Sequence, residues 1–113
     1  MNIQPEWKFI NPVQIVFGAG SIKKLPLYVT WGSALLVTTK GARGRGFVRE
    51  IINALPNTRV TIYDNVRPEP QLIDLEKATE SLGKDRYDGI LAFGGGSSID
   101  TAKVLSYNLS AND

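Results

Sequence analysis

Residues 89–105 decide the fold, and they read Gly-Ile-Leu-Ala-Phe-Gly-Gly-Gly-Ser-Ser-Ile-Asp-Thr-Ala-Lys-Val-Leu. The first five are apolar and typical of a buried strand. Three glycines follow, and they leave the backbone without a Cβ that would keep a ligand away. Ser97 and Ser98 then predict N-cap hydroxyls for a helix. A strand, a glycine turn and a helix start in this order favour a bound phosphate or other anion; the alternative is a tight structural turn.

Strand and helix patterns alternate in the rest of the chain. Short β-branched or apolar runs predict strands over residues 13–17, 34–39, 60–63 and 89–93. Apolar residues at helical spacing predict helices over residues 22–25, 47–55, 72–82 and 99–109, the first limited or kinked by Pro26. This alternation predicts an α/β fold, a Rossmann-like parallel sheet with helices on both faces. The first strand is expected to be an edge strand or part of a β-hairpin, and the domain to be incomplete because no closing strand follows the last helix.

The predicted strand over residues 34–39 is continuous and apolar, which is typical of a central strand covered on both faces. In open parallel sheets, ligands bind at the carboxyl ends of the strands. Thr39, Asp64 and the glycine turn all follow predicted strands at that edge. We therefore expect a ligand site along this edge.

Residues 40–46, Lys-Gly-Ala-Arg-Gly-Arg-Gly, are expected to form a flexible basic loop. Their G-x-x-G-x-G spacing is the wrong order for the dinucleotide fingerprint, which favours Asp64 as a turn residue; the alternative is a ribose-binding acid at the end of its strand. The cations of this region form a positive cluster, which is either a solvated face or a site for a ligand phosphate. They are Lys40, Arg43, Arg45 and Arg49.

Composition restricts the chemistry open to the chain. A length of 113 residues allows one small domain, and 42% hydrophobic with 21% charged residues is ordinary for a globular protein. The chain has no histidine and no cysteine, which excludes a histidine-based hydrolase triad and leaves a poor ligand set for zinc or iron. A net charge of +2 gives no argument for nucleic acid, and no apolar run suggests a membrane span. The N-terminus lacks a signal-peptide pattern, so a cytoplasmic location is expected.

Four stretches together resemble the iron-containing (group III) alcohol dehydrogenases, whose relatives include glycerol dehydrogenase and maleylacetate reductase. In chain order they are Phe17-Gly-Ala-Gly-Ser-Ile22, Val37-Thr-Thr-Lys40, Arg67-Pro-Glu-Pro70 and Gly94-Gly-Gly-Ser-Ser-Ile-Asp-Thr-Ala-Lys103. The resemblance covers about residues 15–109 and is most specific in the last stretch. It implies that residues 1–113 are the N-terminal part of an NAD(P)-binding domain, without the family's helical metal-binding domain.

In that family the glycine–serine turn binds the pyrophosphate of NAD(P). The resemblance therefore implies cofactor binding by Gly94, Gly95, Gly96, Ser97 and Ser98. It places Asp100 and Lys103 on the substrate side of the cofactor. Glu69 matches a cofactor-side position where family members commonly have asparagine.

The resemblance also bears on cofactor preference. Members that prefer NAD often carry an aspartate after the Val-Thr pair, whereas this chain has Thr39 there, followed by Lys40. An uncharged residue removes the repulsion against a 2′-phosphate, and Lys40, Arg43 or Arg45 could pair with that group. The implied cofactor is NADP or NAD, with NADP preferred.

The parent enzyme implied by the resemblance transfers hydride between nicotinamide and a small alcohol or aldehyde, with iron or zinc held by residues that this chain lacks. The chain alone is expected to carry no catalytic residue, to bind no metal and to show no dehydrogenase activity. An uncovered sheet edge could drive homo-oligomer formation. Two other classes stay open from the residues: a kinase-like nucleotide-binding fragment for phosphoryl transfer, and a non-catalytic binding module.

Overall fold

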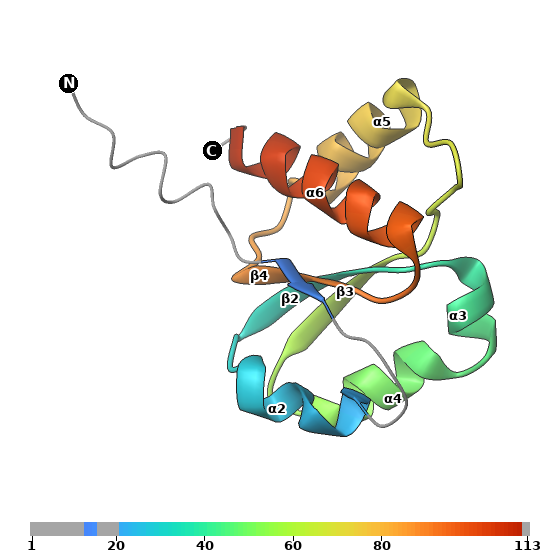
Figure 1. The fold of residues 1–113 in the computed structure, drawn as a ribbon. Coiled ribbons are helices and arrows are strands. Elements are labelled where there is room, and N and C mark those ends of the chain that lie inside the picture. The colour runs from blue at the N-terminus through green and yellow to red at the C-terminus, as the bar shows by residue number, and fades with distance from the viewer. Residues whose placement is uncertain (1–12, 16–20, 112–113) are drawn as a thin grey trace.

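The computed structural model describes residues 13–15 and 21–111 (Figure 1). In chain order the elements are β1 (Val13–Ile15), η1 (Ser21–Lys24), α2 (Leu25–Tyr28), β2 (Ser33–Val37), α3 (Lys40–Gly44), α4 (Phe47–Ala54), β3 (Arg59–Tyr63), α5 (Leu72–Leu82), β4 (Gly89–Ala92) and α6 (Gly96–Ala111). The four strands form one sheet in the order β1-β4-β2-β3, and every pairing is parallel. The predicted Rossmann-like α/β fold is confirmed, and β1 lies at an edge of the described sheet, as one of the two alternatives predicted.

The two central strands, β2 and β4, are buried along their apolar stretches. Ala34, Leu35, Leu36 and Val37 of β2 are 0% exposed, and all four residues of β4 are buried. Residues of a strand with a layer on each face have no side that contacts water, which explains the continuous apolar run. The predicted central strand is therefore confirmed.

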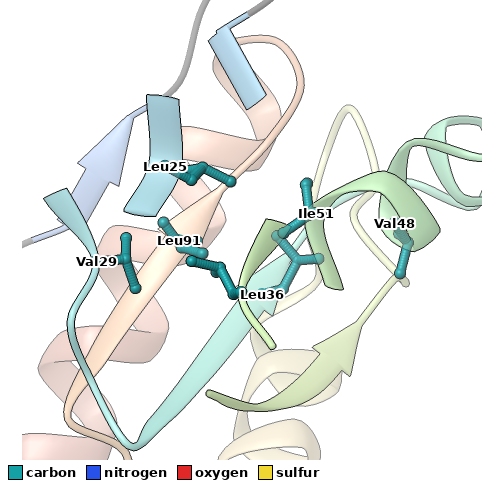
Figure 2. Packing of buried hydrophobic residues seen from close by; sticks show 7 residues of the cluster. Leu25, Val29, Leu36, Val48, Ile51 and Leu91 are labelled. Carbon is teal, nitrogen blue, oxygen red and sulfur yellow. The ribbon is translucent and has the colours of Figure 1, made fainter. Parts of the chain in front are cut away.

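Helices cover both faces of the sheet, α2 and α4 on one and α5 and α6 on the other (Figure 1). Side chains alternate between the two layers because successive residues of a strand point to opposite faces. Leu36 and Leu91 face the α2–α4 layer, where Figure 2 shows them beside Leu25 and Ile51. Leu35 faces the α5–α6 layer instead. Two apolar clusters thus hold the sheet between them.

One predicted loop is a helix. Residues 40–46 were expected to form a flexible connection, but α3 occupies residues 40–44. The Thr39 hydroxyl accepts a hydrogen bond from the Ala42 amide at 3.0 Å and thereby caps the helix. Gly46, with φ of 89°, then separates α3 from α4 in a left-handed conformation that favours glycine.

The region around Pro26 also differs from the prediction. The helical segment expected to be limited there continues as η1 and α2 to Tyr28. Pro26 lies in the first turn of α2, where a helix needs no amide donor, so the proline is tolerated. The turn predicted at Gly18–Gly20 lies outside the described residues. No helix in the described part of the chain combines the length and apolar character needed to cross a bilayer.

Candidate nucleotide-binding site

The carboxyl ends of three strands lie side by side. Val37 at the end of β2 pairs with Ala92 of β4 on one side and with Tyr63 of β3 on the other. The segments that leave these strands therefore start from one edge of the sheet, as the sequence predicted. Thr39 follows β2, Asp64 follows β3, and the glycine turn at residues 94–96 follows β4.

Thr38 fixes the backbone that leads into the glycine turn. Its side chain is 0% exposed, and its hydroxyl donates to the Phe93 carbonyl at 2.7 Å. The Phe93 amide donates to the Val37 carbonyl at 3.0 Å, and the Thr38 amide donates to the Tyr63 carbonyl at 2.9 Å. Thr38 thus joins the ends of β2, β3 and β4. Sequence reasoning missed this role, although a threonine closing an apolar strand was a signal for it.

The glycine turn is shaped by a specific requirement at Gly94. This residue has φ of 143°, which side chains rarely allow, and a Cβ placed on it would lie 2.5 Å from the Ser98 hydroxyl oxygen. Gly95 and Gly96 have open space where a Cβ would be. All three glycines are exposed. The turn therefore presents bare backbone to solvent at the start of a 16-residue helix.

Ser98 is inside the helix rather than at its N-cap. α6 begins at Gly96, and the Ser98 amide donates to the Gly95 carbonyl at 3.0 Å. The predicted capping role of Ser97 and Ser98 is therefore wrong, because the chain already turns helical before them. The Ser98 hydroxyl is fully buried and has no hydrogen-bond partner in the described structure. Most buried hydroxyls are paired, and the Thr101 hydroxyl on the same helix is a second exception among the described residues.

The residues of this turn fit the pyrophosphate of a dinucleotide. The Ser98 hydroxyl is buried in this structure and can donate to a phosphate oxygen only if the turn moves to expose it. The open faces of Gly95 and Gly96 leave room for close approach to the backbone. The partial positive charge at the helix start favours the anion. The bare turn at the start of α6 thus has the chemistry of an anion site.

In the basic segment after β2, Lys40 and Arg43 form ion pairs with Asp64. Arg43 Nη1 lies 2.8 Å from one carboxylate oxygen of Asp64, and Lys40 Nζ lies 3.5 Å from the other. Arg43, and Lys40 after it, hold the pKa of Asp64 below its usual range. A lowered pKa means that this stabilisation is present at neutral pH and is lost as the pH falls through the pKa of the folded state.

The other sequence-predicted residues lie in exposed or half-buried positions. Ser97 is half-buried in the first turn of α6, and Asp100 and Lys103 are exposed further along the same helix. Glu69 is exposed in the connector between β3 and α5. Among the described residues, no ion pair joins Asp100 to Lys103.

The residues present do not fit a metal ion. The sequence contains neither histidine nor cysteine. Over residues 13–15 and 21–111, no three carboxylates gather into a group that could hold a metal. A hard-cation or transition-metal site needs several such donors.

Thr38→Val is expected to lower the free energy of unfolding by about 1–2 kcal/mol, because it leaves the part-buried Phe93 carbonyl without its hydroxyl donor. Valine replaces the hydroxyl by a methyl group of similar shape, so the change isolates the hydrogen bond. Urea denaturation followed by circular dichroism measures the loss. Thr38→Ser keeps the hydroxyl and serves as the matched variant: the Gly94 amide should shift in the NMR spectrum of the valine variant and stay near its position in the serine variant. Unchanged stability in the valine variant would contradict the anchoring role.

Residues 12–113 match the family described as iron-containing alcohol dehydrogenase. The chain is 33% identical over 101 residues to an NADPH-dependent butanol dehydrogenase of Clostridium saccharobutylicum, covering 87% of this chain and 26% of that protein. It is 31% identical over 101 residues to a probable NADH-dependent butanol dehydrogenase of Bacillus subtilis, covering 85% of this chain and 26% of that protein. An iron-containing alcohol dehydrogenase structure from Thermococcus thioreducens superposes with a TM-score of 0.73 at 26% identity, covering 84% of this chain and 26% of that one. The chain thus spans about a quarter of the length of the relatives it matches.

Proposed function

This chain belongs to the iron-containing alcohol dehydrogenase family, and we propose that it is the dinucleotide-binding segment of an NAD(P)-linked alcohol dehydrogenase or aldehyde reductase. The observation that carries this proposal is the turn after β4. At Gly94 any other residue would be strained, and Gly95 and Gly96 have open space beside the backbone. The Ser98 hydroxyl, at the start of α6, is buried without a hydrogen-bond partner among the described residues. Pyrophosphate binding accounts for the open backbone at Gly95 and Gly96.

In the parent enzyme, this chain positions the cofactor. Backbone amides at the start of α6 and the Ser98 hydroxyl bind the pyrophosphate, and the Thr38 hydrogen bond keeps the turn in place for it. Asp100 and Lys103 then face the substrate side. When bound, NAD(P) supplies hydride transfer, here to or from a small alcohol or aldehyde. The parent acts in the cytoplasm, and its metal ligands come from residues outside this chain.

The chain alone is expected to bind the cofactor without turning it over. Titration of the 113-residue protein with NADP⁺, NAD⁺ and ATP–Mg²⁺ tests the class of ligand. Saturable binding of the dinucleotides, and much weaker binding of ATP–Mg²⁺, is the expected result. Preferential binding of ATP–Mg²⁺ would favour phosphoryl transfer, and dehydrogenase turnover by the pure chain would contradict the assignment of catalysis to other residues.

We propose NADP as the preferred cofactor, because Thr39 brings no negative charge to the position beside the adenine ribose. Thr39→Asp is expected to reduce NADP⁺ affinity about tenfold or more by charge repulsion, with NAD⁺ affinity unchanged or higher. Aspartate caps helices as well as threonine does, so α3 keeps its N-cap. Thr39→Asn keeps a capping oxygen without charge and is the matched control. Calorimetric titration with both cofactors decides the question, and equal losses in the aspartate and asparagine variants would contradict the electrostatic explanation.

A further inference from the structure

A groove between α3, α4 and β3 is lined by guanidinium side chains. Its volume is about 540 Å³, and its basic lining is Arg43, Arg45 and Arg49. Val48, Ile52 and Ile62 form the apolar part of the lining. An apolar surface beside a charge reduces competition from water, so guanidinium groups here attract an anion more strongly than they would on a flat surface.

The three arginines differ in their partners. Arg43 is held by Asp64, whereas neither Arg45 nor Arg49 has a carboxylate within 4.0 Å in the described part of the chain. The Arg45 guanidinium lies 5.8 Å from the centre of the Phe47 ring, a cation–π contact that leaves its charge without an anionic partner. Two unpaired cations therefore share one groove.

Arg45 also reaches back to the end of β2. A Cβ placed on Gly41 would lie 3.3 Å from Arg45 Nη1 and 3.8 Å from the Thr39 hydroxyl oxygen. The guanidinium and the hydroxyl thus lie beside the same face of Gly41. Arg45 therefore connects the lining of the groove with the residues that follow β2.

We propose that this groove binds the 2′-phosphate of NADP, with Arg45 as the residue that determines cofactor specificity and Arg49 as a second cation. The proposal rests on the proposed function, because it needs the dinucleotide at the glycine turn. The sequence left Lys40, Arg43 and Arg45 as candidates to pair with the 2′-phosphate, and the proposal selects Arg45 among them. Arg43 pairs with Asp64, which Lys40 also approaches, whereas Arg45 has no carboxylate partner in the described part of the chain and is available to a phosphate.

The chemistry of the groove suits a phosphate monoester. Such a group carries close to two negative charges near neutral pH, and a guanidinium matches two of its oxygens at once. NAD has a neutral hydroxyl at the same place and gains nothing from Arg45. The groove therefore discriminates between the cofactors by attraction, while Thr39 does so by the absence of repulsion.

Arg45→Gln tests the proposal by calorimetric titration of the whole chain with NADP⁺ and with NAD⁺. NADP⁺ affinity is expected to fall at least tenfold, with NAD⁺ affinity within about twofold of the unmodified chain. Arg86→Gln removes an exposed arginine that does not line the groove and is the matched control, expected to change neither affinity. An equal loss for both cofactors would assign Arg45 a structural role and overturn the proposal.

Asp64→Asn is a second test, in which NADP⁺ affinity is expected to rise rather than fall. Loss of this carboxylate frees Lys40 and Arg43 and removes a negative charge near the groove. NADP⁺ affinity should rise severalfold while NAD⁺ affinity stays constant, a gain that misfolding cannot produce. An unchanged or lower NADP⁺ affinity would overturn the division of the cations.

The remaining outcomes separate the two proposals. If the unmodified chain binds NAD⁺ and NADP⁺ equally well, the groove does not bind the 2′-phosphate, and the proposed pyrophosphate site is unaffected. If it binds neither dinucleotide, both proposals fail. Inorganic phosphate is the third probe: if it competes for the groove as tightly as NADP⁺ binds, the groove is a general anion site and the 2′-phosphate assignment is wrong.

Discussion

Gly94→Ala is expected to reduce NADP⁺ affinity at least tenfold and to lower the free energy of unfolding by about 1–3 kcal/mol. Alanine is strained at φ of 143°, and its Cβ would lie 2.5 Å from the Ser98 hydroxyl oxygen. Relief of this contact moves either the turn or the first turn of α6. Both groups that we assign to pyrophosphate binding are displaced by such a movement.

Two other glycine substitutions separate binding from folding. Gly32→Ala adds a Cβ that makes only an ordinary contact, away from the turn and the groove, and is the control for a harmless change. Gly96→Ala also adds its Cβ in open space, at the first residue of α6, so the ligand-free fold should be at least as stable as before. Thermal unfolding and calorimetric titration at a temperature where all variants are folded measure the two effects. Full NADP⁺ affinity in the Gly94 variant would contradict the assigned role of the turn.

Gly89→Ala is expected to destabilise the chain by about 1–3 kcal/mol without touching the proposed ligand site. Gly89 is buried at the start of β4, and the Trp31 ring packs directly against it. A Cβ there would overlap Cη2 of Trp31 and lie 2.6 Å from Cζ2 and Cζ3. The indole must move, and it packs against the cluster around Leu36 and Leu91.

Urea denaturation with Gly32→Ala as the matched variant checks this prediction. Gly32 is exposed, and a Cβ there would make an ordinary contact, 3.5 Å from Asp88 Oδ2. Its substitution should change the free energy of unfolding by less than about 0.5 kcal/mol. Trp31→Leu combined with Gly89→Ala should cost less than the two single changes added together, because the smaller side chain makes room. Strict additivity would show that the two positions do not interact.

The elements of this fold were predictable where a single physical pattern dominates. The apolar run over residues 34–39 indicated a strand covered on both faces, and β2 is fully buried from Ala34 to Val37. Helical spacing over residues 72–82 matched α5 at both ends. The basic segment at residues 40–44 was not predictable in the same way. Its glycines favour a loop, and the helix there starts at a cap in which the Thr39 hydroxyl accepts from the Ala42 amide.

The candidate site was predictable in its residues but not in its contacts. The glycine–serine turn and the cations after β2 were visible in the sequence, whereas the burial of the Ser98 hydroxyl depends on how α6 packs on the sheet. Thr38 at the end of an apolar strand was visible in the sequence, but its partner is a carbonyl 55 residues away in the chain and depends on the fold. Likewise, only the fold shows that Asp64 pairs with Arg43 and leaves Arg45 unpaired.

The most direct test of the central claim is an NMR titration of the chain with NADP⁺, following each backbone amide. We predict saturable shifts that are largest at Gly94, Gly95, Gly96 and Ser98, with smaller shifts at Thr39 beside the adenine ribose. The amides at the start of α6 should move in the same way with NAD⁺, because the pyrophosphate is common to both cofactors. Absence of shifts at residues 94–98 at saturating NADP⁺, or shifts confined to other parts of the chain, would contradict dinucleotide binding at the glycine turn.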